Sequence, residues 1–259
     1  TGALECWGGA MFGISGATRA HVSTPAGVPM PAGFGRIVSL HVGNRPAACV
    51  IDDRGANAFF GSNSYGAVGG DSPYVNHPRP VPGLAEPIRS IATGEGHGCA
   101  VTTAGALRCW GWGSGWGSGS ASPPVGTIVE VAAVPSPSRV AANWDGTCVL
   151  DTAGAPWCGG VRERLTSAST VPLTRFANAP AFVRMHSNAD ASCGLTAAGD
   201  LYCWDGTHIL LNGPLMWSET PARFSRRHTF VDFGVAAHGI CAITTEGETL
   251  CRTRPFGQQ

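Results

Sequence analysis

The sequence predicts an all-β fold built from about five copies of one structural unit. Its composition is the first sign, because the 259 residues include 37 glycines and 19 prolines but only 13% charged residues. Such a chain is typical of many short strands joined by tight turns. The second sign is a regular spacing of cysteines, which recur every 45–50 residues at Cys49, Cys99, Cys148, Cys193 and Cys241. A period of this length indicates an array of repeated supersecondary units.

Each unit contains a predicted β-hairpin. Four cysteine pairs share the same separation: Cys99 and Cys109, Cys148 and Cys158, Cys193 and Cys203, Cys241 and Cys251. If the first two cysteines face each other, Val101 lies opposite Leu107 and the three-residue loop ends in Gly105. A loop of this length commonly ends in a left-handed residue, and glycine tolerates that conformation best. A glycine stands at the same place in each of the five units, so the hairpin prediction extends to all of them.

The four cysteine pairs are predicted to form cross-strand disulfides that staple these hairpins. Directly opposed residues of antiparallel strands have Cα atoms about 4.5–5.5 Å apart, a distance that a disulfide can span. The alternatives are a zinc site and free buried thiols. Zinc usually takes cysteines two to four residues apart, or Cys with His, and neither spacing is present, so no metal site is predicted. Disulfides form in oxidising compartments, and we therefore expect a secreted, periplasmic or cell-surface protein.

Two cysteines fall outside these pairs. Cys49 is predicted to face Phe59, where the other units have a second cysteine, and Cys6 lacks the upstream member of its pair. The even number of cysteines permits a bond between Cys6 and Cys49, but the register of the repeat does not predict one. They remain unassigned, as free thiols or as partners in a bond to another chain.

The second unit resembles the regulator-of-chromosome-condensation repeat. Residues 60–69 read FGSNSYGAVG and are followed by Pro78, Val81 and the segment His97-Gly98-Cys99. The cysteine-bearing CWG form is similar to exported bacterial members of the family. The resemblance spans residues 1–254 and implies a β-propeller with blades of antiparallel strands, usually seven in the family and about five here. It also implies that His97 is structural and that Trp110 and Trp204 pack in the core.

The spacing predicts one repeat domain over residues 1–259. Its units run over about 1–52, 53–102, 103–151, 152–196 and 197–244, with a closing strand at 245–254. The N-terminal segment GALECWG matches the second half of a unit and has no partner before it, whereas the last hairpin already carries both strands. Three interpretations follow: a small propeller with a surplus strand, a part of a larger ring, or a strand that pairs with another copy.

Catalytic signals are absent from the sequence, so we expect a protein that is not an enzyme and that needs no cofactor. The phosphate-binding loop, the nucleophile elbow, the zinc-protease motif and the calcium-binding loop motif are all missing. The glycine-rich stretch 111–119 lacks the lysine and spacing of a phosphate loop. It matches a turn of the family repeat, although its tryptophans also suit binding.

The candidate binding residues are Trp112, Trp116 and Trp144. Tryptophans on loops stack on sugars or anchor protein partners. Propellers present such loops on two faces of a rigid disc. The first hypothesis is therefore an exported, non-catalytic binding or scaffold module that contacts another protein. The alternatives are a carbohydrate-binding module that uses the loop tryptophans and a structural protein that self-assembles through its N-terminal strand.

Nucleic acid and membrane are not expected partners. The net charge is zero, the 17 basic residues are all arginines, and their densest group, Arg223, Arg226 and Arg227, is small. Nucleic-acid binding needs a larger basic surface. No run approaches the roughly 18 apolar residues of a membrane helix, and residues 1–20 lack the pattern of a signal peptide.

Overall fold

The computed structural model describes residues 3–8, 22–43, 47–63, 66–70, 73–111, 127–143, 146–161, 170–188, 191–206, 217–236 and 239–253. These residues form strands and turns, with no helix among them. The strands make five antiparallel sheets of three or four strands and one sheet of two. Each larger sheet contains strands that follow one another in sequence, as the repeat predicts.

The first three blades are complete four-stranded sheets. The first has β3 (Ile37–Val42), β4 (Ala47–Asp52), β5 (Asn57–Ser62) and β6 (Tyr74–Arg79). The second has β7 (Ile88–Thr93), β8 (His97–Thr102), β9 (Leu107–Gly111) and β10 (Val129–Glu130). The third has β11 (Pro137–Ala142), β12 (Gly146–Asp151), β13 (Pro156–Val161) and β14 (Thr170–Arg175).

The remaining strands form a fourth complete blade, a three-stranded fifth blade and a separate two-stranded sheet. The fourth has β15 (Arg184–Asn188), β16 (Ala191–Leu195), β17 (Leu201–Gly206) and β18 (Trp217–Arg223). The fifth has β19 (Phe230–Ala236), β20 (Gly239–Thr244) and β21 (Thr249–Thr253). The two-stranded sheet pairs β1 (Glu5–Gly8) with β2 (Val22–Gly27).

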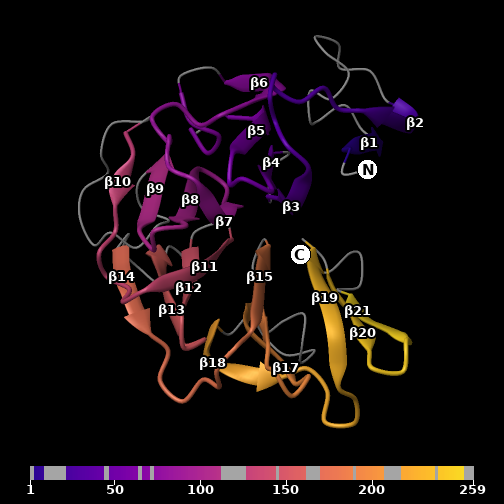
Figure 1. The fold of residues 1–259 in the computed structure, drawn as a ribbon. Helices are drawn as coiled ribbons and strands as arrows, with labels where there is room; N and C mark the ends of the chain where they lie inside the picture. The colour runs from indigo at the N-terminus through magenta and orange to yellow at the C-terminus, as the bar shows by residue number, and fades with distance from the viewer. Residues whose placement is uncertain are drawn as a thin grey trace.

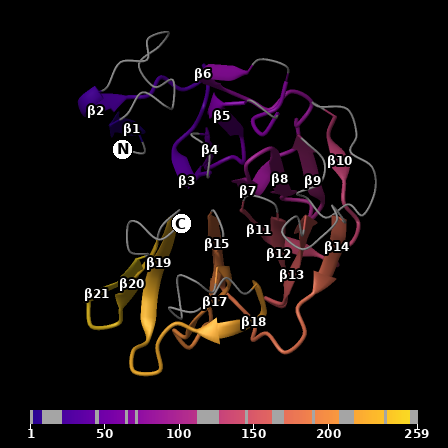
Figure 2. The same ribbon diagram turned by 180° about the vertical axis from the view of Figure 1, so that it is seen from behind.

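The blades follow one another around a common centre, with β3, β7, β11, β15 and β19 as their innermost strands (Figures 1 and 2). The β1–β2 sheet lies at one end of this arc and the β19–β21 sheet at the other. This arrangement is a β-propeller of five blades, which confirms the predicted fold class. The surplus N-terminal strand predicted from the sequence is β1, which pairs with β2.

The predicted hairpin register is confirmed in detail. Cys99 lies opposite Cys109, and Val101 lies opposite Leu107. Gly105 ends the loop with a φ of +86°. All four predicted disulfides are present, with Cα–Cα distances of 4.0–4.2 Å. The repeat spacing therefore defined both the strand pairing and the cysteine pairing.

A side-chain oxygen closes the hairpin turn in every blade. It belongs to the third residue after the first cysteine of each hairpin and accepts a hydrogen bond from a backbone N–H on the other side of the loop. In the second blade, Thr102 Oγ1 accepts from Ala106 N at 3.0 Å. The counterparts of Thr102 are Asp52, Asp151, Thr196 and Thr244. Short polar side chains suit such turns because they bond to nearby backbone groups.

The blades pack through a repeated apolar face. Ile91, the fourth residue of β7, packs against the blade before it and is only 5% exposed there. Its counterpart in the first blade, Leu40, is 51% exposed, because the preceding β1–β2 sheet has no inner strands. At the other end of the arc, Ile243 is 41% exposed while its counterpart Val101 is fully buried. Both ends of the arc thus expose faces that are buried between other blades.

The residues that the family resemblance placed in the core are buried. Trp110 and Trp204 are completely enclosed, and Trp110 Nε1 donates to the Ala67 carbonyl at 3.0 Å. His97 Nε2 lies 2.9 Å from Thr147 Oγ1, which links the second blade to the third. Burial lowers the pKa of His97 to about 4, so this histidine is neutral at physiological pH.

Candidate binding site

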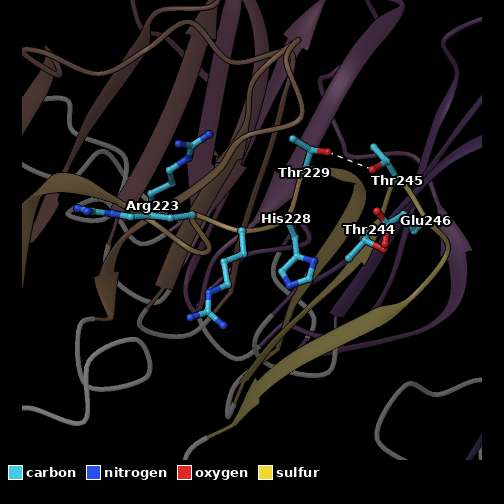
Figure 3. A pocket seen from close by; sticks show the side chains of 8 residues that line it. Arg223, His228, Thr229, Thr244, Thr245 and Glu246 are labelled. Carbon is cyan, nitrogen blue, oxygen red and sulfur yellow. Dashed lines mark hydrogen bonds between the residues drawn. The ribbon is translucent and has the colours of Figure 1, made fainter.

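A pocket with a volume of about 150 Å³ lies where the fourth blade meets the fifth. One wall is the segment between β18 and β19, and the other is the turn between β20 and β21. Figure 3 shows His228 and Thr229 on the first wall, with Thr244, Thr245 and Glu246 on the second. Three arginines also line the pocket: Arg223, Arg226 and Arg227.

The arginine-bearing wall departs from the repeat. Corresponding segments before β7, β11 and β15 read PGLAEP (82–87), AAVPSP (132–137) and ANAPAF (177–182). The segment before β19 reads SRRHTF (225–230). The other three consist mainly of apolar residues and proline, and they make the same connection between blades. The fold therefore does not require Arg226, Arg227 or His228 at this place.

Hydrogen bonds hold the two walls together. Thr245 N donates to the Thr229 carbonyl at 3.0 Å, and the two threonine hydroxyl oxygens lie 3.0 Å apart (Figure 3). Phe230 N donates to the Gly199 carbonyl at 2.8 Å, which fixes the same segment to the fourth blade. The pocket is therefore built on a supported backbone.

The arginines that line the pocket differ in whether they form an ion pair. The Arg223 guanidinium forms a hydrogen-bonded ion pair with Asp200, and this bond raises the pKa of Arg223. Arg226 and Arg227 are exposed and form no ion pair with any residue in the described part of the chain. Glu246 adds one carboxylate on the facing turn. Two guanidinium groups of the pocket thus have no ion-pair partner within the described residues.

The predicted binding tryptophans lie outside the described residues. Trp112 and Trp116 fall in the segment 112–126, and Trp144 falls in 144–145. They stay predictions. The sequence shows the group of arginines but indicates no site there, because nothing in the sequence shows that the turn at 244–246 lies beside it.

The two unassigned cysteines form no disulfide in the structure. Cys49 faces Phe59 as predicted and is buried, while Cys6 is half-buried. Burial raises the pKa of both thiols, more strongly for Cys49. Neither is therefore an activated nucleophile.

The described residues contain no group of three or more His, Cys, Asp or Glu side chains that could hold a metal ion. No helix long and apolar enough to cross a membrane occurs in them.

Known structures share this fold. The chain superposes on yeast RCC1 (Prp20) bound to Kap60 with a TM-score of 0.75 and 20% identity, covering 99% of this chain and 63% of that one. A second structure of Prp20p from Saccharomyces cerevisiae gives 0.74 and 21%, with 91% and 63% covered. Human WBSCR16 gives 0.72 and 19%, with 91% and 67% covered. The chain thus spans less than two thirds of the length of either Prp20 structure. No curated protein matches it.

The blades and their disulfide-stapled hairpins define a β-propeller repeat protein. Residues 88–114 match the family described as "Regulator of chromosome condensation (RCC1) repeat". This segment runs from β7 through β9 and includes the first disulfide pair, so it is the core of the second blade. One repeat of this chain therefore matches the RCC1 repeat, as the sequence resemblance implied, and the fold around it is similar to that of the Prp20 propellers.

Proposed function

We propose that this chain is an exported, non-catalytic binding module that contacts another protein through its propeller loops. The observation that carries the proposal is the SRRHTF segment at 225–230, which places Arg226, Arg227 and His228 at positions that are uncharged in the segments before β7, β11 and β15. A change that the fold does not need, at the rim of a pocket, is typical of a binding surface.

The similar yeast structures support a protein partner. Prp20 is bound to Kap60 in one of these structures, and the other was described together with its binding to Gsp1p and histones. Because a shared fold does not fix a shared partner, the proposal extends to the class of partner only.

The disulfides support export. Four are present, and Cys241 and Cys251 are both exposed. An accessible disulfide is reduced most readily in a reducing cytosol. We infer a secreted, periplasmic or cell-surface location.

A loop exchange tests the proposal. The oxidised chain is used to select binders from a displayed library of random peptides, and a variant carries residues 132–136 (AAVPS) in place of 225–229 (SRRHT). Selected peptides should bind the parent chain and lose most of their affinity for the variant. Thermal unfolding and thiol titration of the variant control for its fold. Selection of no peptide, or equal binding by a correctly folded variant, contradicts the proposal.

Self-assembly is a second candidate because Leu40 and Ile243 are exposed at the two ends of the arc. Contiguous exposed apolar side chains often mark association surfaces. Light scattering across a hundredfold range of concentration tests it, and a monomer throughout would exclude it. The carbohydrate-binding alternative depends on Trp112, Trp116 and Trp144, and a glycan array screened with Trp112→Ala, Trp116→Ala and Trp144→Ala variants tests it.

A further inference from the structure

We propose that the pocket between the fourth and fifth blades binds a carboxylate side chain in an acidic peptide segment of the protein partner. This inference rests on the proposed function, because it names the chemistry that the loop pocket recognises. Its ligand is a single carboxylate group, presented by an extended or turned segment at the rim of the propeller.

The arginines supply the attraction. A guanidinium presents donors in a fork that matches the two oxygens of a carboxylate, and such charge-assisted bonds are stronger than neutral ones. Arg223 is already held by Asp200. Arg226 and Arg227 are not engaged by any ion pair within the described residues, so their donors remain for a ligand.

The threonine pair adds a neutral donor. The hydroxyl oxygens of Thr229 and Thr245 lie 3.0 Å apart, so one hydroxyl donates to the other. The accepting hydroxyl keeps its own proton, because each hydroxyl has one donor and two acceptor positions. Whichever threonine accepts, one O–H on the pocket wall is available to an acceptor atom.

Glu246 and the volume of the pocket narrow the ligand class. A volume of about 150 Å³ is below the roughly 300–1,000 Å³ of pockets that enclose whole small molecules, so it suits the end of one side chain. The Glu246 carboxylate repels a polyanion such as a nucleic acid but accepts a backbone N–H. A peptide that carries one carboxylate beside free N–H groups satisfies both walls.

The test uses two synthetic peptides and a matched pair of variants. One peptide is acetylated and amidated with a single central Glu, and the other carries Gln at that position. The test variant is Arg226→Gln/Arg227→Gln. The control variant, Arg36→Gln/Arg139→Gln, removes two exposed arginines that form no ion pair with described residues and lie in other blades. Affinity is measured by calorimetry at low and high salt.

We expect the acidic peptide to bind the parent chain and the control alike, and about tenfold or more weakly to the test variant, which corresponds to about 1.4 kcal/mol or more. Salt should weaken this binding because the arginines are exposed. Equal binding of the Gln peptide, equal weakening by the control, or no binding of the acidic peptide at millimolar concentration overturns the inference. If library selection enriches peptides without Asp or Glu that still depend on the loop, the proposed function stands and this inference fails.

Discussion

His41 and His186 meet edge to face at the centre of the propeller, although they belong to the first and fourth blades. Their ring centroids lie 5.8 Å apart at an interplanar angle of 87°. Val235 N donates to His186 Nδ1 at 3.1 Å, so this nitrogen is unprotonated. His41 Nε2 lies 3.4 Å from the Thr93 carbonyl. The pair therefore joins two blades that are not neighbours in the arc.

Both histidines resist protonation in the folded state. Burial, followed by the charge that His186 would carry, lowers the pKa of His41 from 6.5 to about 4. Burial and the nearby charge of Arg184 lower the pKa of His186, and Asp232 opposes this shift. A histidine with a depressed pKa favours folding fully above its unfolded pKa and loses that contribution as the pH falls.

We predict that acid destabilises the propeller between pH 6.5 and about 4. Over this range the unfolded chain binds protons that the partly buried histidines of the folded chain do not bind. His41 therefore lowers the free energy of unfolding by about 1.4 kcal/mol per pH unit, and His186 acts in the same direction. Urea unfolding at pH 7.5, 6.5, 5.5 and 4.5 measures the effect. His41→Asn should make the dependence shallower, whereas His77→Asn, which changes an exposed histidine, should not. An identical slope in His41→Asn would contradict the prediction.

The disulfides should differ in their sensitivity to reductant. Cys241 and Cys251 are exposed at the open end of the arc, while Cys99 and Cys109 are completely buried between blades. Thiol–disulfide exchange requires access to a sulfur atom. We expect mild reduction followed by alkylation and mass spectrometry to label Cys241 and Cys251 first. Labelling of Cys99 and Cys109 before Cys241 and Cys251 would contradict the prediction that accessibility sets the order of reduction.

Thiol titration should find two free thiols in the unfolded, unreduced chain, namely Cys6 and Cys49. In the folded chain Cys6 should react slowly and Cys49 should not react, because burial raises both pKa values and encloses Cys49. Cys49→Ala serves as the matched control, since it removes one thiol from the unfolded count only. More than two thiols in the unfolded chain would argue against an oxidising compartment.

Two turn glycines should differ in their tolerance of alanine. Gly105 and Gly154 have φ values of +86° and +81°. Alanine in this left-handed conformation costs about 1–2 kcal/mol in free energy of unfolding at either position. A Cβ at Gly105 meets nothing within 4 Å, whereas at Gly154 it would lie 2.6 Å from the Phe182 carbonyl oxygen. Gly154→Ala should therefore lower the free energy of unfolding more than Gly105→Ala. Equal losses in urea unfolding would mean that the blade contact adjusts without cost.

The hairpins were predictable because their interactions are local. The ten-residue separation of Cys99 and Cys109, with Gly105 between them, defines one register, and the structure has that register. The candidate pocket was not predictable in the same way. Arg226 and Glu246 come together only because the β20–β21 turn folds back beside the segment before β19. The spacing of residues along the sequence does not indicate that these two segments are close in space.

The sequence by itself determined the repeat, the hairpin turns and the cysteine pairs of this protein. These features depend on backbone conformation and on contacts across about ten residues, where few alternatives exist. Only the tertiary structure decided which equivalent side chains are covered. Ile91 and Leu40 occupy the same place in their blades, yet one is buried and the other is half exposed. The difference arises because burial depends on the neighbouring blade, and that neighbour comes from a different part of the chain.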